Sequence, residues 1–408
     1  MLKTCRLLTA LVLLGVVACS DGDRAVNQDH TDPFTAAAEP ESQPETQSEK
    51  EIKAVLTESW EVYQQRFIQG DGRVIDFEAS DRSVSEGQAY GMLRAVLIDD
   101  PATFTKTLSW AEANLRRKQD GQVIDQLWGW QWGRQENDQW GLIDANFASD
   151  ADIDAAFALI LAARRWQQPK YLELAQAKLK DIWDYSTLEV KSQRYLLPGP
   201  AEAFKDPTYV YLNPSYLAPY AFRLFAEVDP ERNWLQLVNS SYQILEKSAT
   251  LSSPGLPSDW VALNVITGNF EPVPASSSFK NQYGFDAYRV WWRVAWDEAL
   301  YDAEPAWEYL KDHLQFLETR WQADQTISAE FDLAGKPLAD YDAIAQYAML
   351  HAAFNLTSPA IAASIYQRQI APRYQAGIWD NQSAYYSQNL VWLGLYPPAQ
   401  IKPLLQSE

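Results

Sequence analysis

The sequence has few of the residues that most often bind metals or form covalent intermediates. Its 408 residues include only three histidines, His30, His313 and His351, and two cysteines, Cys5 and Cys19. The histidines are too few and too widely spaced for a zinc site or for a Ser-His-Asp triad. We therefore expect neither a metal ion nor a cofactor.

Basic residues are also scarce, with 34 lysines and arginines against 54 aspartates and glutamates. The formal net charge of -20 repels polyanions such as nucleic acids and uronate polymers, so we expect no nucleic-acid partner. Among the aromatic residues, 17 Trp and 21 Tyr stand against 15 Phe. The flat faces and polar edges of Trp and Tyr suit stacking on sugar rings as well as core packing.

The one apolar run near the N-terminus is too short to cross a bilayer. Lys3 and Arg6 precede it, and it ends in Val-Val-Ala-Cys at Cys19, an arrangement typical of an export signal that closes on a sequence resembling a bacterial lipobox. We expect residues 1–18 to be a signal peptide, with cleavage before Cys19 and lipidation of its thiol. The alternative is an ordinary secretory signal in which Cys19 has no role. Removal of Cys5 would leave Cys19 alone, so no disulfide could form within the mature chain.

This signal predicts an exported protein that contacts a membrane only through its N-terminal lipid, and we favour the outer membrane, with the chain facing the periplasm or the cell surface. Residues 19–50 are rich in Pro, Ser, Thr, Gln and acidic residues, which predicts a disordered acidic tether. Helical periodicity then continues without a second linker. We therefore expect a single domain at residues 51–400, present as a monomer.

The periodicity of the domain predicts an all-α fold with strands only as short pieces in loops. Alternate segments are apolar on all sides or two-faced, as inner and outer helices would be. Long connections precede the inner segments and short ones follow them, which indicates a ring of helical hairpins with a cleft at one end. Pro219 should kink or shorten one inner helix. The expected helices span residues 52–67, 84–98, 101–118, 150–166, 169–184, 214–227, 230–247, 284–302, 304–321, 339–352, 357–371 and 381–396.

The first inner helix, in the stretch SEGQAYGMLRAV from residue 85 to 96, carries one carboxylate in its first turn, Glu86. Ser85 and Gln88 match a capping box. Glu86 could be no more than a favourable charge at the positive end of the helix dipole. Its role therefore depends on which other residues lie near it.

A second acidic cluster, Asp150, Asp152 and Asp154, opens the next inner helix. A calcium loop would require Gly and Glu where Ala155 and Leu161 stand, so the metal interpretation fails. Ser149 and Asp152 could form another capping box, which would leave Asp150 and Asp154 unexplained beside an apolar helix. Asn213, Tyr216 and Asp286 likewise fall at the starts of inner segments, at the end of the ring where the cleft is expected.

Five motifs occur in the order and spacing of glycoside hydrolase family 8, which the chain resembles from about residue 55 to residue 396. They are SEGQAYGML (85–93), ASDADIDAAFALILAARRW (148–166), NPSY (213–216), GLPSDW (255–260) and FDAYRVWWR (285–293), and Tyr385-Tyr386-Ser387-Gln388 looks like the last motif of the family. The resemblance implies an (α/α)6 barrel of six helical hairpins. It also implies cleavage of β-1,4-linked glycans with inversion, as by cellulases, chitosanases, lichenases and xylanases.

By this resemblance Glu86 corresponds to the general acid and Asp286 to the general base. Asp150 corresponds to the aspartate that holds the sugar at the point of cleavage. Arg289 matches the arginine of its motif, and we expect it to bind substrate together with Trp130, Tyr216 and Tyr386. The chain departs from the family pattern at Ala155, where Ile or Met is usual, and in the Trp-rich run 128–130, which bears on the choice of glycan.

Glu86 and Asp286 lie on two different predicted helices. This suits hydrolysis with inversion, which requires two carboxyl groups roughly 6.5 to 9.5 Å apart on opposite sides of the glycosidic bond. One tension remains, because a helix N-terminus lowers the pKa of a carboxyl group whereas an acid catalyst needs a raised pKa. A nearby carboxylate such as Asp150 would raise the pKa of Glu86 again.

We therefore expect an inverting endo-acting hydrolase of cellulose-type glucan, a β-linked polysaccharide, with chitosan, xylan and mixed-linkage glucan as alternative substrates. A glycan-binding lipoprotein that no longer cuts is the principal rival interpretation, although both carboxylates are present. A polysaccharide lyase acting on an acidic polymer fits poorly with the negative charge.

Overall fold

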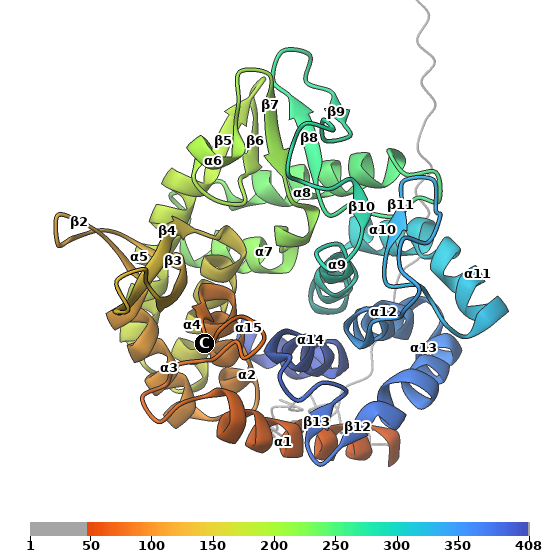
Figure 1. Ribbon diagram of the computed structural model, residues 1–408, viewed down its shortest axis with the longest axis horizontal. Helices are drawn as coiled ribbons and strands as arrows, with labels where there is room; N and C mark the ends of the chain where they lie inside the picture. The colour runs from red at the N-terminus through yellow and green to blue at the C-terminus, as the bar shows by residue number, and fades with distance from the viewer. Residues whose placement is uncertain (1–46, 407–408) are drawn as a thin grey trace, which may run out of the picture. The chain divides into compact units, whose positions relative to one another are not determined.

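The structure is a computed structural model that describes residues 47–406, and helices dominate it (Figure 1). No helix in this range combines the length and apolarity needed to cross a membrane. The helices are α1 (Gln47–Phe67), α2 (Ser85–Leu97), α3 (Pro101–Asn114), α4 (Ser149–Arg165), α5 (Pro169–Ser186), α6 (Ala201–Phe204), α7 (Pro219–Val228), α8 (Trp234–Thr250), α9 (Tyr288–Tyr301), α10 (Glu304–His313), α11 (Gln315–Asp324), α12 (Ile344–Thr357), α13 (Pro359–Ile365), α14 (Tyr385–Leu395) and α15 (Lys402–Leu405).

Six of these helices form a closed inner ring. In the order α2, α4, α7, α9, α12 and α14, each packs against the next, and α14 packs against α2 (Figure 1). Each also pairs with an outer helix: α3, α5, α8, α10, α13 and α1 respectively. The expected (α/α)6 barrel is thereby confirmed.

Burial follows the predicted alternation of inner and outer helices. In the inner helix α4, every residue from Ser149 to Ala162 is buried. Its outer partner α5 buries only one side, through residues such as Tyr171, Leu179 and Ile182. An apolar helix surrounded by neighbours and a two-faced helix against solvent are the arrangements that these sequences favour.

The expectation of only short loop strands is wrong for the connection between α3 and α4. It forms a sheet in which β3 (Gln122–Arg134) pairs with β1 (Ser83–Val84), β2 (Arg116–Gln119) and β4 (Trp140–Phe147). Because residues 116–119 pair with β3, the helix expected at 101–118 ends at Asn114. The valine, isoleucine and tryptophans of β3 favour an extended chain.

The remaining strands are short and lie mostly in the long connections that precede inner helices. They are β5 (Thr187–Val190), β6 (Gln193–Leu196), β7 (Tyr209–Leu212), β8 (Val261–Asn264), β9 (Phe270–Glu271), β10 (Gln282–Tyr283), β11 (Phe331–Asp332), β12 (Tyr374–Gln375) and β13 (Ile378–Trp379). Figure 1 shows β5 to β9 gathered in one lobe beside α7 and α8. The strands build the loop-rich end of the barrel.

Three expected helices are divided in the structure. The segment 214–227 splits into a 3-10 turn at Pro214–Tyr216 and α7, which begins at Pro219. Proline is well suited to the first position of a helix because its missing N–H would have no partner there. The segment 304–321 divides into α10 and α11, and 357–371 divides into α13 and a π-helix at Tyr366–Ile370.

Candidate active site

One arginine side chain joins three carboxylates at the loop-rich end of the barrel. Arg289 Nη1 donates to Glu86 Oε2 at 2.9 Å and to Asp150 Oδ2 at 2.7 Å, and Arg289 Nη2 donates to Asp286 Oδ1 at 2.9 Å. The structure therefore brings together four of the predicted site residues. The Glu86 and Asp286 oxygens are at most roughly 8 Å apart, because their donors belong to one planar guanidinium.

The helix ends explain this convergence. Glu86, Asp150 and Arg289 are each the second residue of an inner helix, α2, α4 and α9. Asp286 lies in the turn just before α9. In a ring of inner helices that start at the same end, residues at these positions meet although the sequence separates Glu86 from Arg289 by 203 positions.

The three carboxylates differ in their access to water. The side chain of Asp150 is 2% exposed, that of Glu86 16% and that of Asp286 36%. A carboxylate that activates water must reach it, whereas a proton donor benefits from a dry environment. The gradient matches the predicted roles of Asp286 as base and Glu86 as acid.

The surroundings of Glu86 favour its protonated form. Burial, with smaller contributions from the charges of Asp150 and Asp286, raises the pKa of Glu86 to about 8, although Arg289 opposes the shift. This shift favours the protonated form that a general acid requires. Sequence reasoning anticipated the effect of Asp150 but not that of burial, which is the largest cause.

The NPSY motif holds the arginine and the predicted base. Asn213 Nδ2 donates to Asp286 Oδ2 at 3.1 Å, and Asn213 Oδ1 accepts from the backbone N–H of Ser215. Ser215 Oγ accepts from Arg289 Nη2 at 2.8 Å. The guanidinium carbon of Arg289 lies 5.2 Å from the ring centre of Tyr216, so this predicted residue does lie at the cluster.

Helix α14 adds two tyrosines. The Tyr385 hydroxyl donates to Glu86 Oε1 at 3.4 Å, and the Tyr386 hydroxyl donates to the carbonyl of Phe285 at 3.0 Å. Tyr386 was predicted to bind substrate and lies beside the turn of Asp286. Tyr385 had no assigned role, although its place at the start of an inner helix is the signal that identified the others.

The aromatic run 128–130 divides between core and surface. Trp128 is fully buried, and its indole N–H donates to Glu112 Oε1 at 2.8 Å. Trp130 is 37% exposed on β3, with the Arg82 guanidinium 5.7 Å from its ring. Only Trp130 of this pair has a face available to a ligand.

Neither expected capping box forms. Ser85 gives α2 no side-chain cap, and Gln88 instead binds Val74 N, Gly72 O and Thr107 O. Gln88 therefore bonds to the loop before α2 and to α3 rather than to the first turn of its own helix.

The second box fails in the same way. Ser149 Oγ donates to the carbonyl of Leu197, and Asp152 accepts from Lys178 Nζ at 2.6 Å. The unexplained Asp154 forms a buried pair with Arg293, one helical turn below the Asp150–Arg289 pair. Asp154 thus belongs to a second charged layer under the site.

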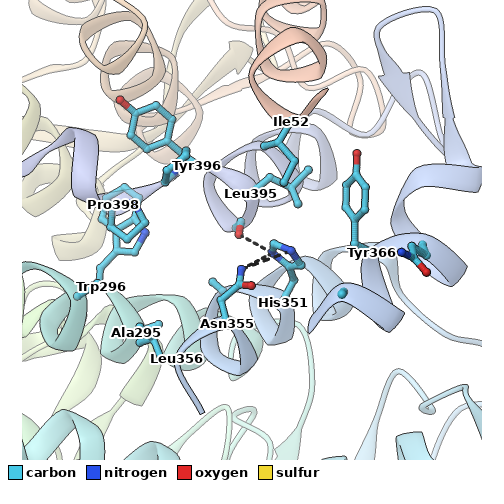
Figure 2. A pocket seen from close by; sticks show the side chains of 16 residues that line it. Ile52, Ala295, Trp296, His351, Asn355, Leu356, Tyr366, Leu395, Tyr396 and Pro398 are labelled. Atoms are coloured by element: carbon cyan, nitrogen blue, oxygen red, sulfur yellow. Dashed lines mark hydrogen bonds between the residues drawn. The ribbon is translucent and has the colours of Figure 1, made fainter. Parts of the chain in front are cut away.

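A cavity of about 360 Å³ lies away from this cluster, toward the C-terminal ends of the inner helices (Figure 2). It is lined by residues such as Trp296 of α9, His351 of α12 and Leu395 of α14. Burial lowers the pKa of His351 to about 4, so its ring is uncharged near neutral pH. None of the lining residues is acidic or basic apart from this histidine, so the cavity cannot provide an acid–base pair.

Within residues 47–406, no group of three His, Cys, Asp or Glu side chains could hold a metal ion. The cations of the site come from arginine side chains. Arg289 in particular uses both of its terminal nitrogens on site residues.

Comparisons with known proteins bear on the family of the chain. Residues 49–397 match the model of the family described as glycosyl hydrolases family 8. An endoglucanase of Pseudomonas fluorescens is 36% identical over 57% of this chain and 58% of its own length. An endoglucanase of Xanthomonas axonopodis pv. citri is 34% identical over 67% of this chain and 68% of its own length.

Among solved structures, the endo-β-1,4-glucanase CMCax of Acetobacter xylinum is similar, with a TM-score of 0.67 and 26% identity over 84% of this chain and 97% of that one. The match to the family model covers the whole barrel, including every inner helix and each carboxylate that Arg289 binds. The chain belongs to glycosyl hydrolases family 8.

Proposed function

We propose that this chain is an endo-acting hydrolase that cleaves β-1,4-linked glucan with inversion at the anomeric carbon. The observation that carries the proposal is the set of three carboxyl groups bound by Arg289: burial raises the pKa of Glu86, whose side chain is 16% exposed, while the side chain of Asp286 is 36% exposed. A non-catalytic glycan-binding protein would have no need of this pair.

In the proposed reaction, Glu86 gives its proton to the glycosidic oxygen as the bond to the anomeric carbon breaks. Asp286 takes a proton from a water molecule whose oxygen attacks that carbon from the opposite face. Glu86 ends as a carboxylate, Asp286 ends protonated, and exchange with solvent restores both. We assign to Asp150, which Arg289 holds at 2.7 Å, the role of binding the sugar at the point of cleavage, as the resemblance implies.

The proposed substrate follows from two considerations. The relatives at 36% and 34% identity carry the name endoglucanase. A chain with a net charge of -20 also favours a neutral polymer over an anionic one. Xylan, mixed-linkage glucan and polycationic chitosan remain the alternatives.

The test is release of reducing ends from amorphous cellulose, mixed-linkage glucan, xylan and chitosan, with proton NMR of the first product formed. We expect the greatest rate on cellulose-type glucan and the α-anomer first. Release of reducing ends from chitosan alone or from xylan alone would contradict the proposed glucan substrate. A β-anomer appearing first would require a nucleophile roughly 5 to 5.5 Å from the acid and would end the pairing of Glu86 with Asp286.

We also propose that Cys19 carries a lipid that anchors the monomeric enzyme to a bacterial membrane, with the outer membrane favoured. This residue lies outside the residues that the structure describes, and the proposal rests on the lipobox-like sequence before it. Mass spectrometry of the mature N-terminus should find an acylated Cys19, and Cys19→Ser should release the protein from the membrane fraction. A mature chain that begins at another residue would contradict the proposal.

A further inference from the structure

A buried carboxyl group outside the catalytic cluster supports the turn that carries Asp286. Asp259, only 6% exposed, precedes β8. Its Oδ1 accepts from the backbone N–H of Gly284 at 3.1 Å and from that of Ala287 at 2.9 Å. These two N–H groups flank Asp286, so one side-chain oxygen fixes both sides of the turn.

The backbone of Asp259 strengthens this attachment. Its N–H donates to the carbonyl of Gln282 at 2.6 Å, so Asp259 binds the segment 282–287 at three points. β10, which includes Gln282, pairs in turn with β11. The segment is therefore also paired with the connection between α11 and α12 immediately before the turn begins.

Gly284 has no side chain, and this leaves the space that the carboxyl group of Asp259 occupies. A Cβ atom at this position would lie 2.8 Å from Asp259 Oδ2 and 3.0 Å from Gln282 Nε2. Real Cβ atoms do not approach an oxygen that closely, so any larger residue would displace Asp259 or the turn. The glycine is thus needed for space.

Asp286 depends on this attachment because it lies outside the regular part of α9. Its carboxylate is held by Asn213 and Arg289, but its side chain is 36% exposed and its backbone belongs to a turn. A displacement of about 1 Å at such a group can cost roughly 100-fold in rate.

We propose that Asp259 is a positioning residue for the general base: it fixes the turn 284–287 and so aims Asp286 at the attacking water. The inference rests on the proposed function, in which Asp286 is that base. Burial, together with the charge of Asp286, raises the pKa of Asp259, so a carboxyl group is costly here and is retained for the hydrogen bonds that it accepts.

The test compares Asp259→Ala, Asp259→Asn and Gly284→Ala on cello-oligosaccharides. Asp259→Ala removes the acceptor and should lower kcat by roughly 10- to 100-fold with little change in KM. Asp259→Asn keeps an acceptor oxygen for both N–H groups and should retain kcat within a few-fold. Gly284→Ala should resemble Asp259→Ala, because the added methyl group displaces the carboxyl group.

Two further measurements separate positioning from general damage. The double variant Asp259→Ala/Gly284→Ala should be no slower than Asp259→Ala, since the methyl group then has nothing to displace. A substrate with a good leaving group should not restore the rate, because the defect concerns the base and not the proton donor. The control Asp229→Ala removes an equally buried carboxyl group, which binds Arg232 and Trp234, and should keep kcat.

The inference is overturned if folded Asp259→Ala keeps its kcat, if a good leaving group restores its rate, or if Asp259→Asn is as slow as Asp259→Ala. Folding is checked by thermal unfolding of each variant. The unmutated enzyme serves to separate the two proposals. If the unmutated enzyme yields no α-anomer from glucan, the proposed function fails. If it yields the α-anomer and Asp259→Ala has the same kcat, only the positioning role of Asp259 is contradicted.

Discussion

Replacement of Glu86 by glutamine is expected to lower the hydrolysis of unactivated cello-oligosaccharides by roughly 10²- to 10⁴-fold, because the amide cannot donate the proton that the leaving oxygen requires. Aryl glycosides with a good leaving group need less protonation and should lose much less. The measurement is kcat for both substrate types. The exposed Glu308 of α10, which pairs with Lys311, supplies the matched control, and Glu308→Gln should leave both rates unchanged.

The pH dependence provides a second readout for Glu86. Since burial raises its pKa to about 8, the proton donor is present below that pH and is lost as pH rises through it. The kcat/KM of the unmutated enzyme should therefore fall on the alkaline side near pH 8, and this limb should be absent in Glu86→Gln. An alkaline limb that persists in the variant, or an equal loss on both substrate types, would remove Glu86 from the role of acid.

Replacement of Asp286 by asparagine is expected to lower kcat by roughly 10²- to 10⁴-fold, as for Glu86→Gln, but on both kinds of substrate. The variant keeps Glu86 as proton donor but cannot accept a proton from water, so a good leaving group gives no rescue. Added azide needs no deprotonation and can attack from the face that Asp286 serves. The expected product is an α-glycosyl azide, identified by proton NMR.

The control for this variant is Asp312→Asn, an exposed aspartate of α10 that should keep its activity. A β-glycosyl azide would indicate attack on a covalent intermediate and would contradict direct inversion. Full activity of Asp286→Asn would show that Asp286 is not the base.

The sequence predicted the ring of helices because burial leaves a strong pattern in composition. A helix such as α4, buried on every side from Ser149 to Ala162, reads as apolar throughout apart from a few acidic residues. It also predicted that Glu86, Asp150 and Asp286 lie at one end, since each falls at or just before the start of an inner helix. What it could not predict is the partner of each polar side chain, which depends on contacts far along the chain.

The errors follow from this limit. Gln88 and Asp152 have the spacing of capping residues, but Gln88 bonds to a preceding loop and Asp152 bonds to Lys178 of α5. The sheet around β3 was missed because its longest strand owes its extended form to three neighbours in space, which local periodicity does not reveal. Resemblance assigned Arg289 to substrate binding, but nothing in its local sequence predicts that it joins three carboxylates or distinguishes it from Arg293.

Closure of the inner ring between α14 and α2 bears on how the enzyme can be made in the cell. Tyr385 donates to Glu86 across 299 positions of sequence, and the indole N–H of Trp392 reaches the carbonyl of Leu56 across 336. During synthesis the acid emerges long before the helix that completes its surroundings, and contacts of such separation form slowly. The apolar faces of α1 and α2 therefore stay exposed until α14 packs against them, and a shortened product that ends before Tyr385 lacks one contact of the catalytic centre.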